Sequence, residues 1–191
     1  MKYEPNPKQL ADGRFFVKVS NDDDSQVMVQ LNNSKLNSDL SDDDISIAVS
    51  DQCQQRITDL DAATIRAATE NCKAWFGKEL SEKTLMAAFS RSIIDSTIDV
   101  SKLASKKQVH THVYDHTKTE IVDSSTVVSG TVCDVVLECT GVWFLKKTYG
   151  LVWRLLQIRL KPPPKKSRTD IYLFQDEVEE SSDDDDDDDL Y

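Results

Sequence analysis

The segment "GVWFLKKTYGLVWRLLQIRLK" (residues 141–161) constrains the fold more than any other part of the chain. It holds two stretches rich in β-branched and aromatic residues around a short basic connection, which indicates a β-hairpin with a long second strand. Side chains alternate between the faces of a strand. Alternation predicts a core face with Val152, Leu156, Ile158 and Leu160. It predicts a solvent face with Trp153, Gln157, Arg159 and Lys161, on which Leu155 is an apolar exception.

Further strands are indicated by short β-rich stretches between turns. They are "RFFVKV" (14–19), "QVMVQL" (26–31), "ISIAV" (45–49), "QVHTHVYD" (108–115), "TVCDVVLECT" (131–140) and "DIYLF" (170–174). From about Leu60 to Ser90 the apolar spacing is helical, with a break at Gly77 and a cap at Ser81.

This pattern predicts a mainly β (α+β) fold: an elaborated OB-fold-like barrel or sandwich with an inserted helical hairpin, or alternatively a jelly roll. We expect one β-barrel domain at residues 1–175, with its helical insertion at about 60–90, and a disordered acidic tail at 176–191.

The net charge of -11 is concentrated near the end of the sequence. From Asp170 onward there are twelve acidic residues and no basic ones, so residues 1–169 carry 23 basic and 22 acidic side chains. An acidic pI therefore does not exclude nucleic acid as a partner of the body. The four cysteines show no CxxC spacing, and the sequence has no apolar run of membrane-spanning length. We expect an intracellular protein with free thiols that does not enter a membrane.

The candidate site is an acid-free window from Cys139 to Thr169, in which basic and aromatic residues mix. Single-strand binders need this mixture, because cations follow the phosphates while aromatic rings stack on bases. The predicted nucleic-acid-binding residues are Trp143, Phe144, Lys146, Lys147, Tyr149, Trp153, Arg154, Gln157, Arg159, Lys161, Lys165, Lys166 and Arg168.

No pattern indicates catalysis or a cofactor. His110, His112 and His116 have H-x-H-x3-H spacing, and His110 and His112 would share a strand face, which permits metal ligands, but no acidic or cysteine partner accompanies them. We therefore predict no metal, no cofactor and no enzymatic activity.

Two motifs resemble a family of proteins from nucleocytoplasmic large DNA viruses, including algal and giant viruses, that look like single-stranded DNA-binding proteins. The resemblance covers about residues 60–191. It lies on Asn71, Trp75, Phe76, Gly141, Val142, Trp143, Phe144, Gly150, Trp153 and Gln157, with Tyr149 where the family has Phe. The resemblance implies a role in viral DNA replication, recombination or repair, in the host nucleus or at a cytoplasmic viral replication site.

The acidic end is similar to the tails of bacterial and phage single-stranded DNA-binding proteins, which recruit replication partners and compete with DNA for the basic groove. Seven aspartates imitate a phosphate run, and an apolar pair supplies an anchor. The predicted partner-binding tail is Asp183, Asp184, Asp185, Asp186, Asp187, Asp188, Asp189, Leu190 and Tyr191. The expected partners are single-stranded DNA and replication or recombination proteins, with self-association left open. The alternatives are an acidic-tailed histone chaperone and a virion or scaffold protein.

Overall fold

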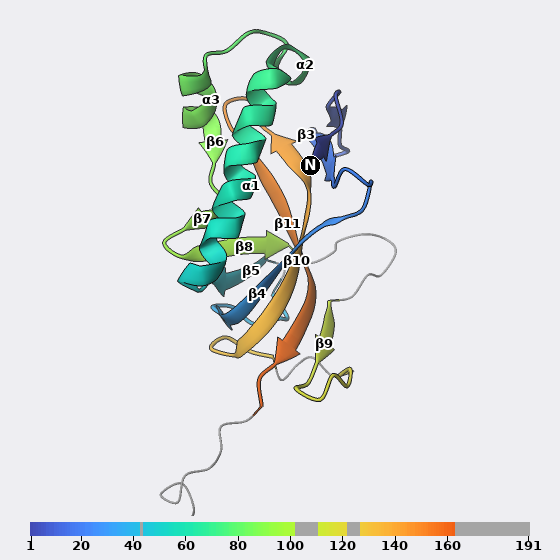
Figure 1. Cartoon of the computed structure of the whole chain (residues 1–191), viewed down its shortest axis with the longest axis vertical. Coiled ribbons are helices and arrows are strands. Elements are labelled where there is room, and N and C mark those ends of the chain that lie inside the picture. Colours follow the sequence, from blue (N-terminus) through green and yellow to red (C-terminus); the bar gives the residue numbers. More distant parts are fainter. Residues whose placement is uncertain (43, 102–110, 122–126, 163–191) are drawn as a thin grey trace, which may run out of the picture.

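Two long antiparallel strands, β10 (Val132–Phe144) and β11 (Tyr149–Leu160), form the spine of the molecule (Figure 1). The structure is a computed structural model that describes residues 1–42, 44–101, 111–121 and 127–162. Within this part of the chain the other strands are β1 (Lys2–Tyr3), β2 (Lys8–Gln9), β3 (Phe15–Ser20), β4 (Val27–Leu36), β5 (Asp44–Ala48), β6 (Phe89–Ser90), β7 (Ile93–Ile94), β8 (Thr97–Ser101) and β9 (His112–Tyr114). The helices are α1 (Asp51–Glu70), α2 (Cys72–Phe76) and α3 (Glu82–Ala88).

Five of the strands close into a barrel. β10 pairs with β4, β4 with β5, β5 with β8, β8 with β11, and β11 returns to β10. All pairings in this circuit are antiparallel except β8 with β11, which is parallel. A five-stranded Greek-key barrel of this kind is an OB-like fold, so the predicted mainly β architecture is confirmed.

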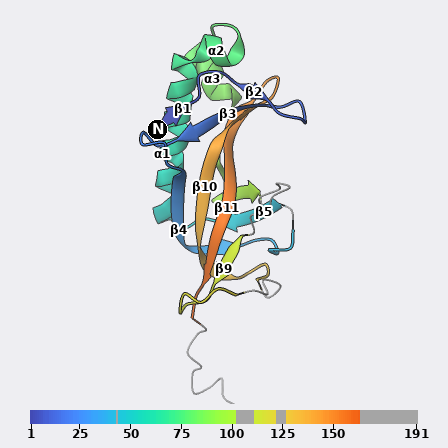
Figure 2. The same ribbon diagram turned by 90° about the vertical axis from the view of Figure 1, so that its right-hand side faces the viewer.

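The remaining strands extend this barrel at its margins. β3 pairs with the upper end of β10 and carries β1 and β2, whereas β6 and β9 pair with β11. Figure 2 shows β10 and β11 side by side down the length of the molecule, with α1 along one flank and β9 near the lower end. One face of the long hairpin is thereby left facing away from the helices.

The helices occupy residues 51–88, so the helical segment begins earlier than the sequence pattern predicts. Gly77 ends α2 in the left-handed conformation (φ 71°), which glycine adopts without steric cost. The Ser81 hydroxyl accepts a hydrogen bond from the Thr84 backbone N–H and caps α3, as predicted. No described helix is long and apolar enough to span a membrane.

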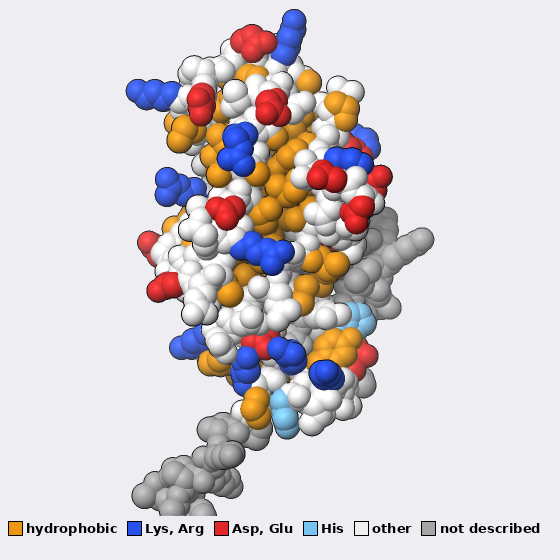
Figure 3. All heavy atoms as spheres, viewed as in Figure 1, with side chains coloured by type: hydrophobic (Ala, Val, Ile, Leu, Met, Phe, Trp, Pro, Cys, Tyr) orange, Lys and Arg blue, Asp and Glu red, His pale blue; other side chains and the backbone are white. Residues whose placement is uncertain are grey.

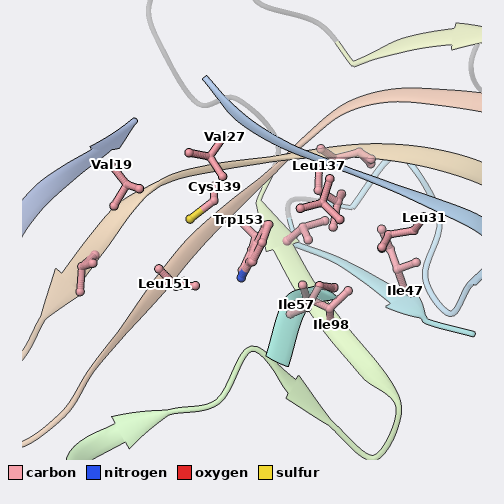
Figure 4. Close-up of a cluster of buried hydrophobic side chains, with 14 of the residues drawn as sticks. Val19, Val27, Leu31, Ile47, Ile57, Ile98, Leu137, Cys139, Leu151 and Trp153 are labelled. Atoms are coloured by element: carbon pink, nitrogen blue, oxygen red, sulfur yellow. The ribbon is translucent and has the colours of Figure 1, made fainter. Parts of the chain in front are cut away.

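The core fills the barrel and continues under α1. Figure 4 shows Ile57 of α1 together with Ile98, Leu137, Cys139 and Trp153 from the strands. Alternate residues of β10 point into this core, because Cys133, Val135, Leu137 and Cys139 are all buried. All four cysteines are free thiols, and burial raises the pKa of both Cys133 and Cys139 to about 12.

Strand boundaries differ from prediction at the hairpin. The segments predicted separately at 131–140 and 141–144 form the single strand β10, and the turn falls at residues 145–148. The predicted strand at 170–174, the domain boundary at 175 and the tail lie outside the described residues.

Candidate nucleic-acid interface

A β-bulge in β11 decides which side chains of the predicted site reach solvent. Val136 of β10 pairs with Gln157, but its neighbour Leu137 pairs with Leu155, so Leu156 is an extra residue. A bulge reverses the side-chain alternation that follows it. Trp153 and Leu155 therefore point inward above the bulge, whereas Ile158 points inward below it.

The predicted solvent exposure of Trp153 is consequently wrong. Only 4% of Trp153 is exposed, and its indole Nε1 donates to the Ser92 hydroxyl at 2.8 Å. That hydroxyl donates to the Asp61 carboxylate at 2.6 Å, and the Ser92 backbone N–H donates to the same carboxylate at 2.9 Å. Trp153 is thus a core residue tied to α1. The predicted burial of Val152 and Leu156 is also wrong, since both are half-exposed.

Phe144 and Tyr149 are buried as well, at the upper end of the spine. Their rings stack at a centroid distance of 6.0 Å and contact Phe76 at 5.5 and 5.3 Å. Burial raises the pKa of the Tyr149 phenol to about 12. Neither ring can stack on a base without unfolding this cluster, so their predicted contact with nucleic acid is not available in this structure. Trp75 and Phe76, which carry the upstream motif, belong to the same cluster.

Two other aromatic rings do lie on the outer face, where glycines make room for them. Phe16 of β3 pairs with Trp143 of β10, and both are half-exposed. A Cβ on Gly141 would lie 2.3 Å from the Phe16 ring, and a Cβ on Gly150 would lie 3.1 Å from the Trp143 ring. The Gly141 and Gly150 positions therefore let the two rings lie flat against the sheet.

Cations continue this face below the rings, held by carboxylates from the neighbouring strand. Arg154 pairs with Glu138 at 3.4 Å, while Arg159 pairs with Asp134 at 2.5 Å and Lys161 also contacts Asp134. The sequence window lacks acidic residues, yet strand pairing supplies two of them from β10. Their side chains are buried (5% exposed for Asp134), whereas the Arg159 side chain is 46% exposed. The cations thus lie over the carboxylates and are the charged groups of these pairs that reach solvent.

Asp134 holds the lower cations in place. Burial alone would raise the pKa of its carboxyl, but hydrogen bonds from Lys161, Arg159 and the Asn33 backbone N–H lower the pKa to about 2. The carboxylate therefore stays ionised at physiological pH, and its oxygens already accept hydrogen bonds from these three donors. This arrangement orients the Arg159 guanidinium at the surface.

Two hollows of about 290 Å³ each lie along this outer face. The upper hollow is lined by Phe16, Lys18, Thr140 and Arg154, among others. The lower hollow is lined by Gln30, Tyr114, Lys118, Gln157 and Arg159, among others. Figure 3 shows Lys, Arg and His side chains gathered at the lower end of the molecule, around β9 and the ends of β10 and β11.

The opposite part of the barrel surface is acidic. OB folds commonly bind their ligands across the second and third barrel strands, which are β5 and β8 here. Their described outward side chains include Asp44 and Asp99 and no Lys or Arg. Among the described residues, exposed cations thus lie on the outer face of β3, β10 and β11, which we call the basic face, and not on the outward side of β5 and β8.

The predicted residues thus divide into three groups. Trp143, Arg154, Gln157, Arg159 and Lys161 lie on the basic face, with Lys146 and Lys147 exposed at the hairpin tip. Phe144, Tyr149 and Trp153 are buried, and Lys165, Lys166, Arg168 and the tail 183–191 lie outside the described residues. Sequence reasoning missed Phe16, Lys18, Gln30, Tyr114 and Lys118. Alternation does place Phe16 and Lys18 opposite Val17 and Val19, but only strand pairing brings them beside Trp143.

His112 takes part in a different interaction from the one that metal spacing suggests. Its Nδ1 pairs with the Glu120 carboxylate at 2.5 Å, and its ring stacks on Tyr114 at 6.4 Å. Among the described residues, no group of three His, Cys, Asp or Glu side chains is placed to hold a metal ion. His110 lies outside the described residues.

Fold and surface together define an OB-like barrel protein with a basic, aromatic outer face. The chain belongs to the family described as "Family of unknown function (DUF5871)", whose profile matches residues 18–176. None of the curated proteins compared with the chain matches it.

Solved structures similar to the chain include the single-stranded DNA-binding protein of bacteriophage Enc34. The free phage protein is 11% identical, with a TM-score of 0.47, covering 88% of this chain and 96% of its own. The same protein in complex with single-stranded DNA is 10% identical, with a TM-score of 0.44, covering 85% and 94%.

Proposed function

We propose that this protein binds single-stranded DNA on the basic face and catalyses no reaction. The observation that carries the proposal is the arrangement of that face: cations that reach solvent cover buried carboxylates and continue from two half-exposed rings. Phosphate neutralisation by Lys18, Arg154, Arg159 and Lys161 supplies affinity, because bound counterions are released. Phe16 and Trp143 supply stacking platforms, at roughly 1–3 kcal/mol per base.

The geometry favours a single strand over a duplex. From Gly150 to Arg159 the outer surface of β11 spans roughly 30 Å, at about 3.3 Å per residue. Stacking on Phe16 or Trp143 needs an unpaired base with a free face, which a duplex does not offer. The hollows beside Arg154 and Arg159 give such bases space next to the phosphate contacts.

The test is a set of fluorescence-anisotropy titrations with labelled oligothymidine, duplex DNA and core histones at several salt concentrations. We expect the tightest binding to the single strand and a linear fall of log K with log salt. Lys18→Ala should weaken binding and reduce the salt slope by about 1, whereas the matched control Lys83→Ala on α3 should change neither. Binding to histones with none to single strands at low salt would refute the proposal in favour of a chaperone.

Trp143 offers a second readout. It is the half-exposed tryptophan of the three, whereas Trp75 and Trp153 are buried. Oligothymidine should quench the fluorescence of the protein, and Trp143→Phe should abolish most of that quenching while the protein stays folded. Quenching that persists in the Trp143→Phe variant would place the bases elsewhere.

We also propose that the acidic segment Asp183–Asp189 competes with DNA for the basic face, and that Leu190 and Tyr191 bind a replication or recombination protein. Seven aspartates resemble a run of phosphates, and tethering gives them an effective concentration of order millimolar. An apolar pair supplies an anchor that charge alone lacks. The role we propose is in viral DNA replication, recombination or repair, in the host nucleus or at a cytoplasmic replication site.

A further inference from the structure

The lower hollow of the basic face is lined by amide and aromatic side chains that phosphate binding does not require. Phosphate recognition needs cations and backbone N–H groups. This hollow adds two carboxamides, Gln30 and Gln157, and an aromatic ring, Tyr114, within about 290 Å³. Amides and a ring are the groups that recognise the edge and the face of a nucleobase.

The two carboxamides flank one apolar residue. Gln30 on β4 and Gln157 on β11 both pair with Val136 on β10, from opposite sides. Adjacent strands lie about 4.8 Å apart, so the two glutamine backbones are roughly 10 Å apart with Val136 between them. A flat ligand can therefore rest on Val136 while its edge reaches an amide.

Both amides retain hydrogen-bonding capacity. The Gln30 Nε2 donates to the Asn32 side-chain oxygen at 2.7 Å, which leaves the Gln30 carbonyl oxygen as an acceptor. Gln157 is exposed, and within the described residues its side chain makes no hydrogen bond. The pair thus offers one complete carboxamide and one additional acceptor, which suits a base that carries an exocyclic amino group.

Tyr114 and Arg159 close the hollow on its remaining side. They pair across β9 and β11, and Asp134 fixes the guanidinium through Nε at 3.1 Å. The Tyr114 ring is half-exposed and stacks on His112, which holds its plane. A base in the hollow would meet an aromatic face, while its phosphate lies near Arg159.

We propose that the lower hollow is a base-specific subsite that prefers adenine over thymine. A carboxamide bonds adenine through the amino group and the adjacent ring nitrogen, whereas thymine has no amino group to donate to the second acceptor. The larger purine face also stacks better on Tyr114. This inference rests on the proposed function, because the subsite reads one base of a strand that the cations hold.

The experiment compares oligothymidine with the same oligonucleotide containing one adenine at each position in turn. We expect one position at which adenine tightens binding about tenfold, as for a bidentate amide contact. Gln157→Leu should remove that preference, so that this variant binds the adenine-containing oligonucleotide and oligothymidine within about twofold of each other. The matched control Gln55→Leu, an exposed glutamine on α1, should keep the preference, and circular dichroism melting checks that each variant folds.

The outcomes separate the two proposals. Equal binding of every oligonucleotide by the natural protein would refute the base subsite and leave single-strand binding standing. No binding of any oligonucleotide would refute both. If both the Gln157→Leu and the Tyr114→Ala variants still prefer adenine over thymine, the discrimination between these bases takes place outside the lower hollow. Full displacement of the oligonucleotide by adenosine monophosphate at equal concentration would identify a free-nucleotide pocket instead of a strand contact.

Discussion

Replacing Trp153 by alanine should destabilise the protein, not simply weaken its binding to DNA. A buried tryptophan removes roughly 200 Å² from water, worth roughly 5 kcal/mol at about 25 cal/mol per Å². Alanine keeps part of this buried area, and Trp→Ala substitutions in cores lower the free energy of unfolding by about 3–5 kcal/mol. Loss of the indole donor also leaves the Ser92 hydroxyl oxygen without the hydrogen bond that it accepts, while Ser92 still donates to Asp61. We expect a loss of about 4 kcal/mol in the free energy of unfolding.

The assay is urea unfolding followed by circular dichroism, with Gln157→Ala as the exposed control on the same strand. Trp153→Phe separates the two contributions, because it keeps most of the apolar volume and removes the Nε1 donor. It should cost about 1 kcal/mol more in the natural protein than in a Ser92→Ala background. A Trp153→Ala protein that loses less than about 1 kcal/mol and binds DNA weakly would refute the buried position and restore the solvent-facing prediction.

Three further predictions concern charge, packing and the tail. Asp134→Asn should lower the free energy of unfolding by about 1 kcal/mol at neutral pH, a value discounted for the exposure of both cations. Because folding lowers the pKa of the Asp134 carboxyl from 3.8 to about 2, the stability difference between the two proteins should vanish as the pH falls through this range, which an acid-unfolding series measures. Gly141→Ala should lower the melting temperature, since the new Cβ would lie 2.2 Å from the Val17 carbonyl oxygen. Gly130→Ala is the control, because a Cβ there has no atom within 4 Å and its effect measures only the strain of the positive φ. Deleting Ser181–Tyr191 should raise DNA affinity at low salt, and should raise it less at high salt; unchanged DNA affinity of this truncated protein at low salt would refute competition by the tail. Deleting only Leu190 and Tyr191 should leave DNA affinity unchanged and abolish capture of a replication partner.

Local patterns predicted much of the fold. Features that depend only on neighbouring residues could be predicted from the sequence. They include the strands at 14–19, 26–31 and 45–49, the helix break at Gly77 and the helix cap at Ser81. The hairpin predicted within residues 141–161 is likewise present, as the upper part of β10 together with β11. Of its predicted site residues in the described part of the chain, the exposed ones are mostly charged or polar, because a charge is costly to bury without a partner.

Only the tertiary structure decided which aromatic residues face solvent. Trp143 and Trp153 look alike in sequence, but the bulge at Leu156 turns Trp153 inward, and Leu155 on the supposed solvent face was the one local sign of it. A bulge is defined by the partner strand, so alternation within one strand cannot locate it. The acid-free window is likewise a property of sequence order, whereas the electrostatics depend on distance through space. Strand pairing places Glu138 and Asp134 beneath the cations, and that juxtaposition holds the cationic groups in fixed positions at the surface.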